Sequence, residues 1–561
     1  MVKPALGLVV SACVAVTLLG CRAATPHAGG SAPRPQLFSG MGSHSRAIRT
    51  SDRVAQQYFD QGLVWAYAFN HDEAIRSFQE AARRDPACAL PWWGVALANG
   101  PHINNPIVTP ERSQAAWTAL QEALARRPNA SACEQALIDA LAARYANPAP
   151  DDRRPLDEAY AAAMGRVWQS YPEDVDVGTL YAESLMDLQP WDLWDSAGQP
   201  KGRTNEILAV LERVLELDPK HPGACHLYIH AQEAGPNPQK ADAAAAILRK
   251  AVPAASHLVH MPAHIDVQMG RWALAADQNV RATEADTRYR KLVPRQGFYR
   301  LYMAHNHHFL AFASMMEGRS AAALAAARAM IANVPEDYAR ENAALMDPYM
   351  MIALDVLKRF GRWDDVLAEP AAPDYLPITT AYRHYARGVA LAAKGDAAAA
   401  KDEQAAFRNA VKNVPDDALM AINPAHKVLA IAEHVLDGEI ALSERRIDAA
   451  VAALQEAVTI EDTLLYMEPP EWIQPARHTL GAILVGARRF REAEQVYRDD
   501  LERWPENGWS LHGLMTCLKA QNKATEAAAV EQRFKKTWAR ADVKIGSSCL
   551  CVPENARLAA K

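Results

Sequence analysis

The sequence predicts an all-α fold, a solenoid of about ten or eleven helical hairpins. Three observations predict it. Small and large residues recur in a fixed order with a period of about 34 residues, prolines follow the second helix of several periods, and the alanine-rich composition shows almost no apolar–polar alternation of the kind strands need. We expect this solenoid to span residues 47–545 of the 561-residue chain, followed by a C-terminal tail at 546–561.

The N-terminus carries an export signal. Met1-Val2-Lys3 and the apolar run from Ala5 to Leu19 are typical of a secretory signal over residues 1–20. Its ending, Leu18-Leu19-Gly20-Cys21, resembles the bacterial lipobox, which implies that Cys21 is the lipid anchor. Residues 21–46 are rich in Ala, Gly, Ser and Pro and predict a flexible tether. The alternative is an ordinary signal cleaved nearby.

The protein is therefore expected to be exported and held at the cell envelope by its lipid alone, since the rest of the chain has no stretch long and apolar enough to span a membrane. Arg22 after the anchor suggests the outer membrane or periplasm if the cell is Gram-negative. A formal charge of −6 with mixed signs argues against nucleic-acid binding. Cys88, Cys133, Cys225 and Cys517 are expected in the core, and Cys549 and Cys551 are too close for an easy bridge to each other.

The repeat itself is best seen in one early and one late period. The early residues are Tyr58, Gly62, Trp65, Ala74, Phe78, Ala81 and Pro86, and the late ones are Gly481, Leu484, Ala493, Tyr497 and Pro505. They match the tetratricopeptide pattern, and the chain resembles that family over about residues 50–540. The resemblance implies a right-handed superhelix in which small residues let paired helices approach and large ones fill the gaps between hairpins.

Three insertions interrupt the period, at about 100–112, 188–203 and 464–475. Each contains proline, and the second and third contain tryptophan. Long loops in a solenoid often form binding or lid elements, and the alternative is that they are hydrophobic plugs.

Eight histidines fall in three short helical stretches within residues 226–308. In repeat numbering, seven of them occupy positions 2, 5 and 9 of three successive first helices, which in tetratricopeptide proteins line the concave groove. The predicted metal ligands are His226, His230, Glu233, His257, His260, His264, His305 and His308. His307, one residue out of register, should point elsewhere. Because adjacent helices pack about 10 Å apart, these side chains are expected to converge.

Seven imidazoles exceed the needs of one structural zinc ion and suit one or two transition-metal ions, copper, zinc or iron. The nearby Met261 and Met303 favour copper. Glu468 in the third insertion is a candidate catalytic base, with Glu471 as a second carboxylate. His71, His102 and Glu183 are weaker candidates, and His478 is remote in sequence.

The histidine segments and the segment Tyr466-Met467-Glu468-Pro469-Pro470-Glu471-Trp472 resemble those of a group of bacterial tetratricopeptide-repeat proteins. That resemblance implies a shared architecture and no particular reaction. Three functions remain open: an exported metalloenzyme acting on a small molecule or peptide in the groove, a metal-handling lipoprotein, or a scaffold whose groove binds an acidic peptide or another protein partner.

Overall fold

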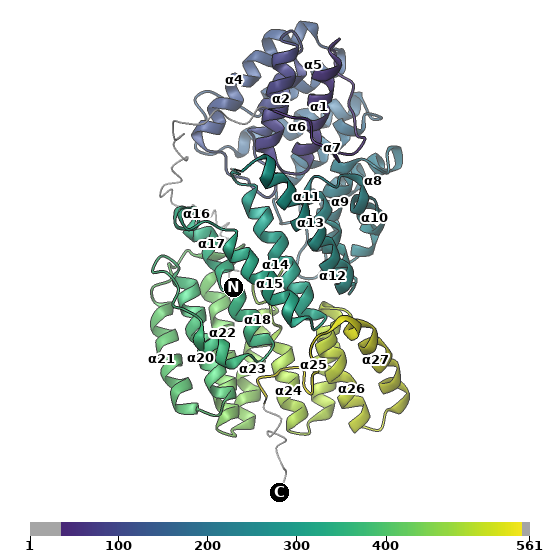
Figure 1. Ribbon diagram of the computed structural model, residues 1–561. Helices are drawn as coiled ribbons and strands as arrows, with labels where there is room; N and C mark the ends of the chain where they lie inside the picture. The colour runs from purple at the N-terminus through teal and green to yellow at the C-terminus, as the bar shows by residue number, and fades with distance from the viewer. Residues whose placement is uncertain (1–34, 295, 553–561) are drawn as a thin grey trace, which may run out of the picture.

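The computed structural model describes residues 35–294 and 296–552, whose regular secondary structure is almost all helical. The predicted signal at residues 1–20 and the predicted lipid anchor Cys21 lie outside the described residues. Consecutive helices pair as hairpins that stack into an elongated array (Figure 1). No helix among the described residues has the length and hydropathy to cross a membrane.

The N-terminal part of the array contains five hairpins and two short 3-10 turns. Its elements are α1 (Arg53–Tyr67), α2 (His71–Arg84), α3 (Leu90–Ala98), α4 (Pro110–Arg126), η1 (Arg127–Asn129), α5 (Ala132–Ala142), α6 (Arg154–Ser170), α7 (Val175–Met186), α8 (Thr204–Leu217), α9 (Pro222–Glu233), η2 (Pro238–Ala241) and α10 (Asp242–Ala251). The middle elements are α11 (Ser256–His260), α12 (Pro262–Gln268), α13 (Trp272–Leu292), α14 (Arg300–Met316) and α15 (Ser320–Ala332).

The C-terminal part adds further hairpins and one two-residue β-ladder. Its elements are α16 (Glu336–Glu341), α17 (Ala343–Met350), α18 (Ile352–Arg359), α19 (Trp363–Ala368), α20 (Pro377–Ala393), α21 (Ala397–Val411), β1 (Leu419–Met420), β2 (Asn423–Pro424), α22 (Ala425–Ser443), α23 (Ile447–Glu461), α24 (Ala476–Gly486), α25 (Phe490–Arg503), α26 (Gly508–Ala520), α27 (Ala524–Thr537) and η3 (Trp538–Arg540). The strands pair antiparallel, with Leu419 opposite Pro424.

Glycines at the helix crossings confirm the packing that the repeat pattern predicts. A Cβ atom on Gly62 of α1 or Gly94 of α3 would lie 2.6 or 2.7 Å from the ring of Phe78, which α2 inserts between them. The late repeat is built the same way, since Tyr497 of α25 lies between Gly481 and Gly513. Only a residue without a side chain permits this approach. The fold is a tetratricopeptide-like helical-repeat array.

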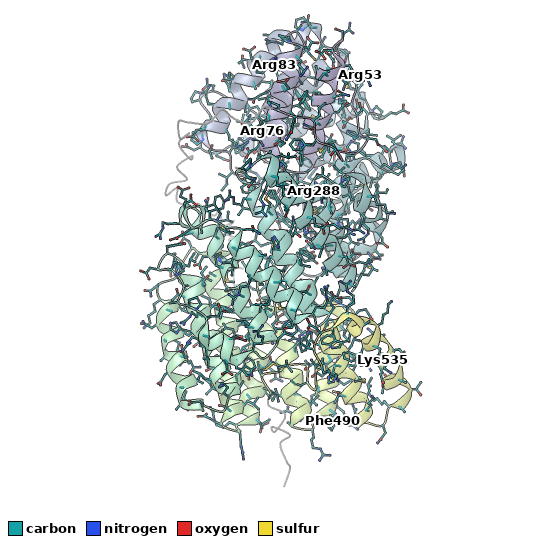
Figure 2. All side chains as sticks on the ribbon, viewed as in Figure 1. Arg53, Arg76, Arg83, Arg288, Phe490 and Lys535 are labelled. Carbon is teal, nitrogen blue, oxygen red and sulfur yellow. A yellow bond between two sulfur atoms is a disulfide. The ribbon has the colours of Figure 1, made fainter. Side chains whose placement is uncertain are left out.

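The array does not stay open, because both ends return to its middle. At the N-terminal end, the Tyr289 hydroxyl of α13 donates to Glu73 of α2 at 2.9 Å. At the C-terminal end, the Trp272 indole donates to the Pro505 carbonyl at 2.9 Å, and the Trp509 indole donates to the Met315 carbonyl at 2.8 Å. In Figure 1, α25 to α27 lie beside α12 and α15. Polar side chains such as Arg83 and Lys535 cover the outside (Figure 2).

The predicted tether boundary at residue 46 is wrong, because residues 36–46 pack on the first hairpins. The Phe38 ring lies edge-on to Trp65 at 5.5 Å, and the Arg46 guanidinium forms an ion pair with Asp174 at 2.6 Å. His44 lies 3.0 Å from the Asp176 carboxylate. These buried partners fix the segment before the first helix begins.

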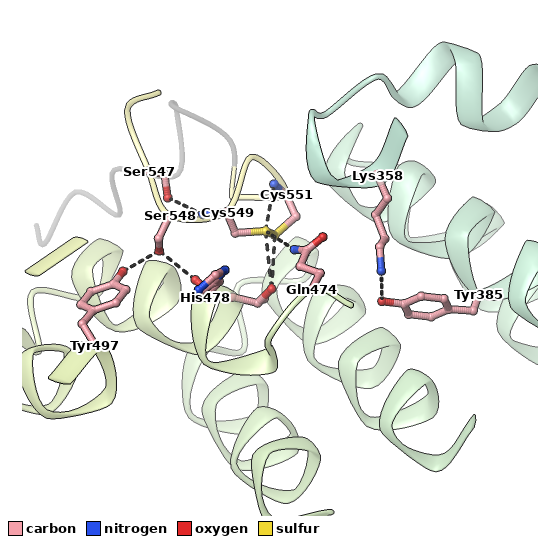
Figure 3. Close-up of a disulfide and its surroundings, with 10 residues drawn as sticks. Lys358, Tyr385, Gln474, His478, Tyr497, Ser547, Ser548, Cys549 and Cys551 are labelled. Atoms are coloured by element: carbon pink, nitrogen blue, oxygen red, sulfur yellow. Dashed lines mark hydrogen bonds between the residues drawn. A yellow bond between two sulfur atoms is a disulfide. The ribbon is translucent and has the colours of Figure 1, made fainter. Parts of the chain in front are cut away.

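The predicted tail is also partly structured, and its cysteines pair with each other. Cys549 and Cys551 form a disulfide that is buried against α24, contrary to the expectation that they are too close (Figure 3). Beside it, the Ser548 hydroxyl donates to the His478 carbonyl at 2.8 Å. Cys88, Cys225 and Cys517 are buried free thiols, as expected, and Cys133 is only partly buried.

Candidate metal centre

Six of the predicted histidines form two clusters of three on the inner wall of the array. The first cluster contains His226 and His230 of α9 with His257 of α11, and the second contains His260 of α11, His264 of α12 and His305 of α14. Within each cluster the candidate ligand atoms lie within 4.8 Å of one another. A four-coordinate ion with bonds of about 2.0–2.1 Å needs its ligands somewhat closer, a distance that small side-chain movements cover.

The two clusters have nearly the same shape. In the first, the ring centroids are 4.8, 4.8 and 6.2 Å apart, and in the second they are 4.8, 4.8 and 6.0 Å apart. The clusters are also neighbours, since the His257 and His260 rings are separated by 5.9 Å. The break between α11 and α12 at Pro262 lies inside this arrangement, where the proline begins a new helix without needing an N–H donor.

The hydrogen bonds of the first cluster fix its tautomers. The His226 Nδ1 atom donates to the Tyr67 carbonyl at 2.7 Å, and the His230 Nδ1 atom donates to Glu233 at 2.8 Å. A neutral imidazole protonated at Nδ1 carries its lone pair on Nε2. Both Nε2 atoms, and both ring nitrogens of His257, are buried without a hydrogen-bond partner. This is the pattern of metal-ligating histidines, whose second nitrogen is held by a carbonyl or carboxylate.

The second cluster brings the Nε2 atoms of His260 and His264 face to face. The Asn279 amide donates to the Ala275 carbonyl at 2.9 Å, so its oxygen faces the Nδ1 atom of His260 at 2.8 Å. The His264 Nδ1 atom lies 2.6 Å from Glu233, and this carboxylate helps to raise the pKa of His264 to about 10. The His264 ring is therefore protonated on both nitrogens, and its Nε2 atom donates to the Nε2 atom of His260 at 2.8 Å. A metal ion bound between the two rings would take the place of this proton.

Two buried carboxylates connect the clusters. Glu233 contacts His230 of the first cluster with one oxygen and His264 of the second with the other. Although burial raises the pKa of Glu233, its two imidazole partners outweigh it and lower that pKa to about 2. Glu468 lies 3.2 Å from His264 and accepts a hydrogen bond from Gln268. It comes from the third insertion and so from the C-terminal part of the array.

Burial dominates the protonation of the other imidazoles. It lowers the pKa of His226, His257 and His260 well below 6.5, and the neighbouring rings lower these pKa values further. Burial would also lower the pKa of His264, but Glu233 and Glu468 outweigh it and raise that pKa to about 10. The metal-free protein therefore holds neutral imidazoles at His226, His257 and His260 beside an imidazolium at His264. Neutral imidazole is the form that binds metal.

A cavity of about 220 Å³ adjoins both clusters. His230, His257, His264 and His305 line it on one side. All three insertions also reach it, through Asn104, Trp191 and the pair Met467 and Glu468. The insertions are therefore part of the wall of the site, in agreement with a lid or binding role. These loops cover the predicted concave groove in this region, so that the histidines line a cavity.

Each insertion is fastened by a specific contact. The Arg144 guanidinium donates to the Pro101 carbonyl at 3.1 Å, and the Trp194 indole donates to the Ala231 carbonyl of α9 at 2.8 Å. In the third insertion, the Asn423 amide donates to Glu471 at 2.9 Å. Glu471 is therefore engaged with β2 and does not join the clusters.

His308 is the one predicted histidine ligand that joins neither cluster. Its ring lies 5.5 Å from the Tyr349 ring on the far wall of the cavity. A helix rises about 1.5 Å per residue, so a residue three positions after His305 is displaced by almost one turn. His307 points away, as expected, with its Nε2 atom 3.2 Å from the Asn333 amide.

The weaker candidates lie behind or away from the clusters. The His71 and His102 rings are 4.4 Å apart, and Phe69 lies between His102 and His226 with centroid distances of 4.4 and 4.5 Å. The pKa of Glu183 is raised to about 8 by burial and by Asp187, away from the metal-ligand groups. His478 pairs with Asp500 at 2.9 Å, remote from the site as expected.

Several residues of the site had no signal in the sequence. Asn279 and the Tyr67 carbonyl orient ligands, but an asparagine inside a helix and a main-chain oxygen carry no pattern. A further group, His44, Asp176 and His221, also has metal-like spacing. In this group, the Asp176 carboxylate already accepts a hydrogen bond from the Tyr67 hydroxyl at 2.7 Å and lies 3.1 Å from the His221 ring. Its hydrogen-bonding capacity is therefore used within the fold, and we interpret the group as structural.

The described chain is thus a helical-repeat protein with two buried three-histidine clusters. No protein-family model matches its sequence, and no curated protein matches it. Among solved structures, the human IFIT1 dimer with m7Gppp-AAAA is 14% identical and covers 87% of this chain and 90% of its own, with a TM-score of 0.31. The APC/C hetero-tetramer Cut9–Hcn1 is 11% identical, covers 86% and 76%, and also scores 0.31. These scores are too low to carry an argument, so the fold rests on the hairpin packing described above.

Proposed function

We propose that this protein is a metalloenzyme that binds one or two transition-metal ions through its two histidine clusters. The observation that carries the proposal is the set of buried imidazole nitrogens in the first cluster that have no hydrogen-bond partner, namely the Nε2 atoms of His226 and His230 and both ring nitrogens of His257. A buried polar group without a partner costs about 1–3 kcal/mol, and a bound cation would remove that cost at several atoms together.

The ligand set suits copper, zinc or iron. Copper is the most favoured of these ions, because Met261 and Met303 lie close to the cluster histidines in the sequence. The described residues include four free cysteines, and none of them belongs to a histidine cluster, so the ligands of the site are imidazoles and carboxylates. When bound, the metal would supply Lewis-acid, hydroxide or redox chemistry to a substrate in the adjoining cavity.

Glu468 is the group of this chain best placed to hold a proton during that chemistry. It lines the cavity and contacts His264, and burial raises the pKa of its carboxyl group. A general base works best when its pKa lies near the working pH, so the raised value fits the role predicted from the sequence.

Metal analysis tests the proposal. We expect the purified, tag-free mature protein to carry one or two equivalents of metal, and the His260→Ala/His264→Ala double variant to lose about one equivalent, because two of three ligands of one cluster are gone. The matched control is His307→Ala on the same helix as His305, which should keep the full content. The readout is mass-spectrometric metal content, with an absorption spectrum under oxygen to separate copper or iron from zinc.

Two results would contradict the proposal. The first is protein that stays folded and metal-free after incubation with copper, zinc and iron salts, because the clusters would then have no metal-binding role. If such protein bound a peptide, the scaffold function would be favoured. Full metal occupancy without turnover of any substrate would instead favour metal handling.

The same proposal includes export and lipid anchoring at Cys21, supported by the lipobox-like ending of the signal. We expect the full chain expressed in a bacterium to fractionate with membranes and to incorporate labelled palmitate. Cys21→Ser should abolish the label and release the protein from the membrane fraction, whereas Cys133→Ser should change neither. Label retained in Cys21→Ser would show that the anchor lies elsewhere.

A further inference from the structure

Much of the cavity lining beside the histidine clusters is hydrocarbon. It includes Phe298, Leu301, Met330, Leu345, Met346 and Ile422. No lysine or arginine lines the cavity. Its one imidazolium, His264, is already paired with Glu233, and its one carboxylate, Glu468, is engaged with His264 and Gln268. A charged ligand would lose its hydration there without gaining a side-chain counter-ion, and burial of an unpaired charge is strongly unfavourable.

Apart from the histidine clusters and Glu468, three polar atoms of the cavity-lining residues lack a well-formed hydrogen bond. They are the Nδ1 atom of His308, the hydroxyl of Tyr302, which has the Asn104 side chain as a neighbour, and the side-chain oxygen of Asn104. His308 and Tyr302 are both more than nine-tenths buried. Because a buried polar atom normally finds a hydrogen-bond partner, these atoms indicate a ligand that carries a polar group of its own.

The size of the cavity limits that ligand. An apolar cavity of about 150 Å³ in another protein binds benzene, and the cavity here measures about 220 Å³. It therefore has room for one substituted aromatic ring. Leu345 lines the cavity and is also 41% exposed to solvent, which places it at the mouth.

We propose that this cavity binds an uncharged molecule of the size of a substituted benzene ring, with a hydroxyl-type group facing His308 and Tyr302. The inference rests on the proposed function, because it makes this molecule the substrate class of the neighbouring clusters. The apolar lining holds the ring, the polar atoms orient it, and the histidine clusters lie beside it. A peptide does not fit, since the three insertions close the space around the histidines.

Ligand-observed NMR with phenol, toluene and benzoate tests the inference on the full mature protein, first metal-free and then metal-loaded. We expect phenol to bind the metal-free protein at least tenfold more tightly than benzoate, and several-fold more tightly than toluene. Tyr302→Phe/His308→Phe should remove the preference for phenol over toluene, because the hydroxyl then has no partner at either position.

Two filling variants from different elements, Leu345→Trp and Ile422→Trp, should each weaken phenol binding at least tenfold. The matched control is Leu274→Trp, a leucine of α13 that is 44% exposed and lies outside the cavity, and it should bind phenol as the parent does. Equal affinity for benzoate and phenol, or phenol binding that survives both filling variants, would overturn the inference. Metal content measured on the same samples keeps the two proposals separate, since protein that binds phenol but no metal contradicts only the proposed function.

Discussion

Replacing Glu233 by glutamine is expected to weaken metal binding at both clusters by about 10- to 100-fold, the usual cost of losing an outer-shell partner. Glu233 accepts from His230 with one oxygen and contacts His264 with the other. A glutamine offers one oxygen and one NH₂ group, so it can satisfy only one of these imidazoles and turns a donor toward the other. Both rings therefore cannot keep their present tautomer and orientation.

Titration with copper or zinc against a chromophoric chelator measures this effect. Glu439→Gln is the matched control, since Glu439 is also a buried glutamate but lies beside the disulfide, in another part of the array. A loss confined to one cluster would show that Glu233 does not couple the two, and unchanged affinity at both would show that these carboxylate contacts do not orient the ligands.

Glu439→Gln is itself expected to make the protein progressively more stable than the parent as the pH rises from 5 to 8. Burial raises the pKa of Glu439 from 4.5 to about 8, although nearby Lys358 acts against it. Between these values the unfolded chain has released the proton and the folded chain keeps it. The free energy of unfolding therefore falls by roughly 1.4 kcal/mol per pH unit as the pH rises, and glutamine removes that slope.

Melting temperatures at pH 5, 6, 7 and 8 check the sign of this effect. The difference between variant and parent should grow with pH. Burial lowers the pKa of Lys358 to about 8, so its own contribution begins only above this window. Glu502→Gln, an exposed glutamate of α25, should show a constant difference. If the difference in melting temperature between Glu439→Gln and the parent also stayed constant with pH, the Glu439 carboxyl group would have to be ionised in the folded protein.

The register of the repeat predicted most of the site. Positions 2, 5 and 9 of successive first helices share one face, and this local geometry placed His226, His230, His257, His260, His264 and His305 within reach of one another. The same register rule was wrong for His308. This residue lies almost one helical turn after His305 on α14, and the second cluster does not extend that far along the helix. Residue periodicity fixes which face a side chain occupies, but it does not fix how far along the neighbouring helix the contact falls.

The rest of the site depends on contacts between residues far apart in the chain. Glu468 reaches His264 only because the C-terminal hairpins dock on α12 to α15, and repeat numbering contains no information on that docking. Residues 36–46 were expected to form a tether from their composition, yet the ion pair of Arg46 with Asp174 and the packing of Phe38 on Trp65 hold them. Composition describes average behaviour and misses a segment fixed by a few specific partners.

The return of both ends to the middle has a consequence for how the chain matures. Repeat arrays commonly tolerate removal of terminal units, because each unit touches only its neighbours. Here, a nascent chain that stops before residue 468 contains every imidazole of both clusters. It lacks Glu468 and the rest of the third insertion, which line the cavity beside the clusters. Under the proposed function, the enclosed form of the metal site therefore forms only after the chain has been made beyond residue 468 of 561.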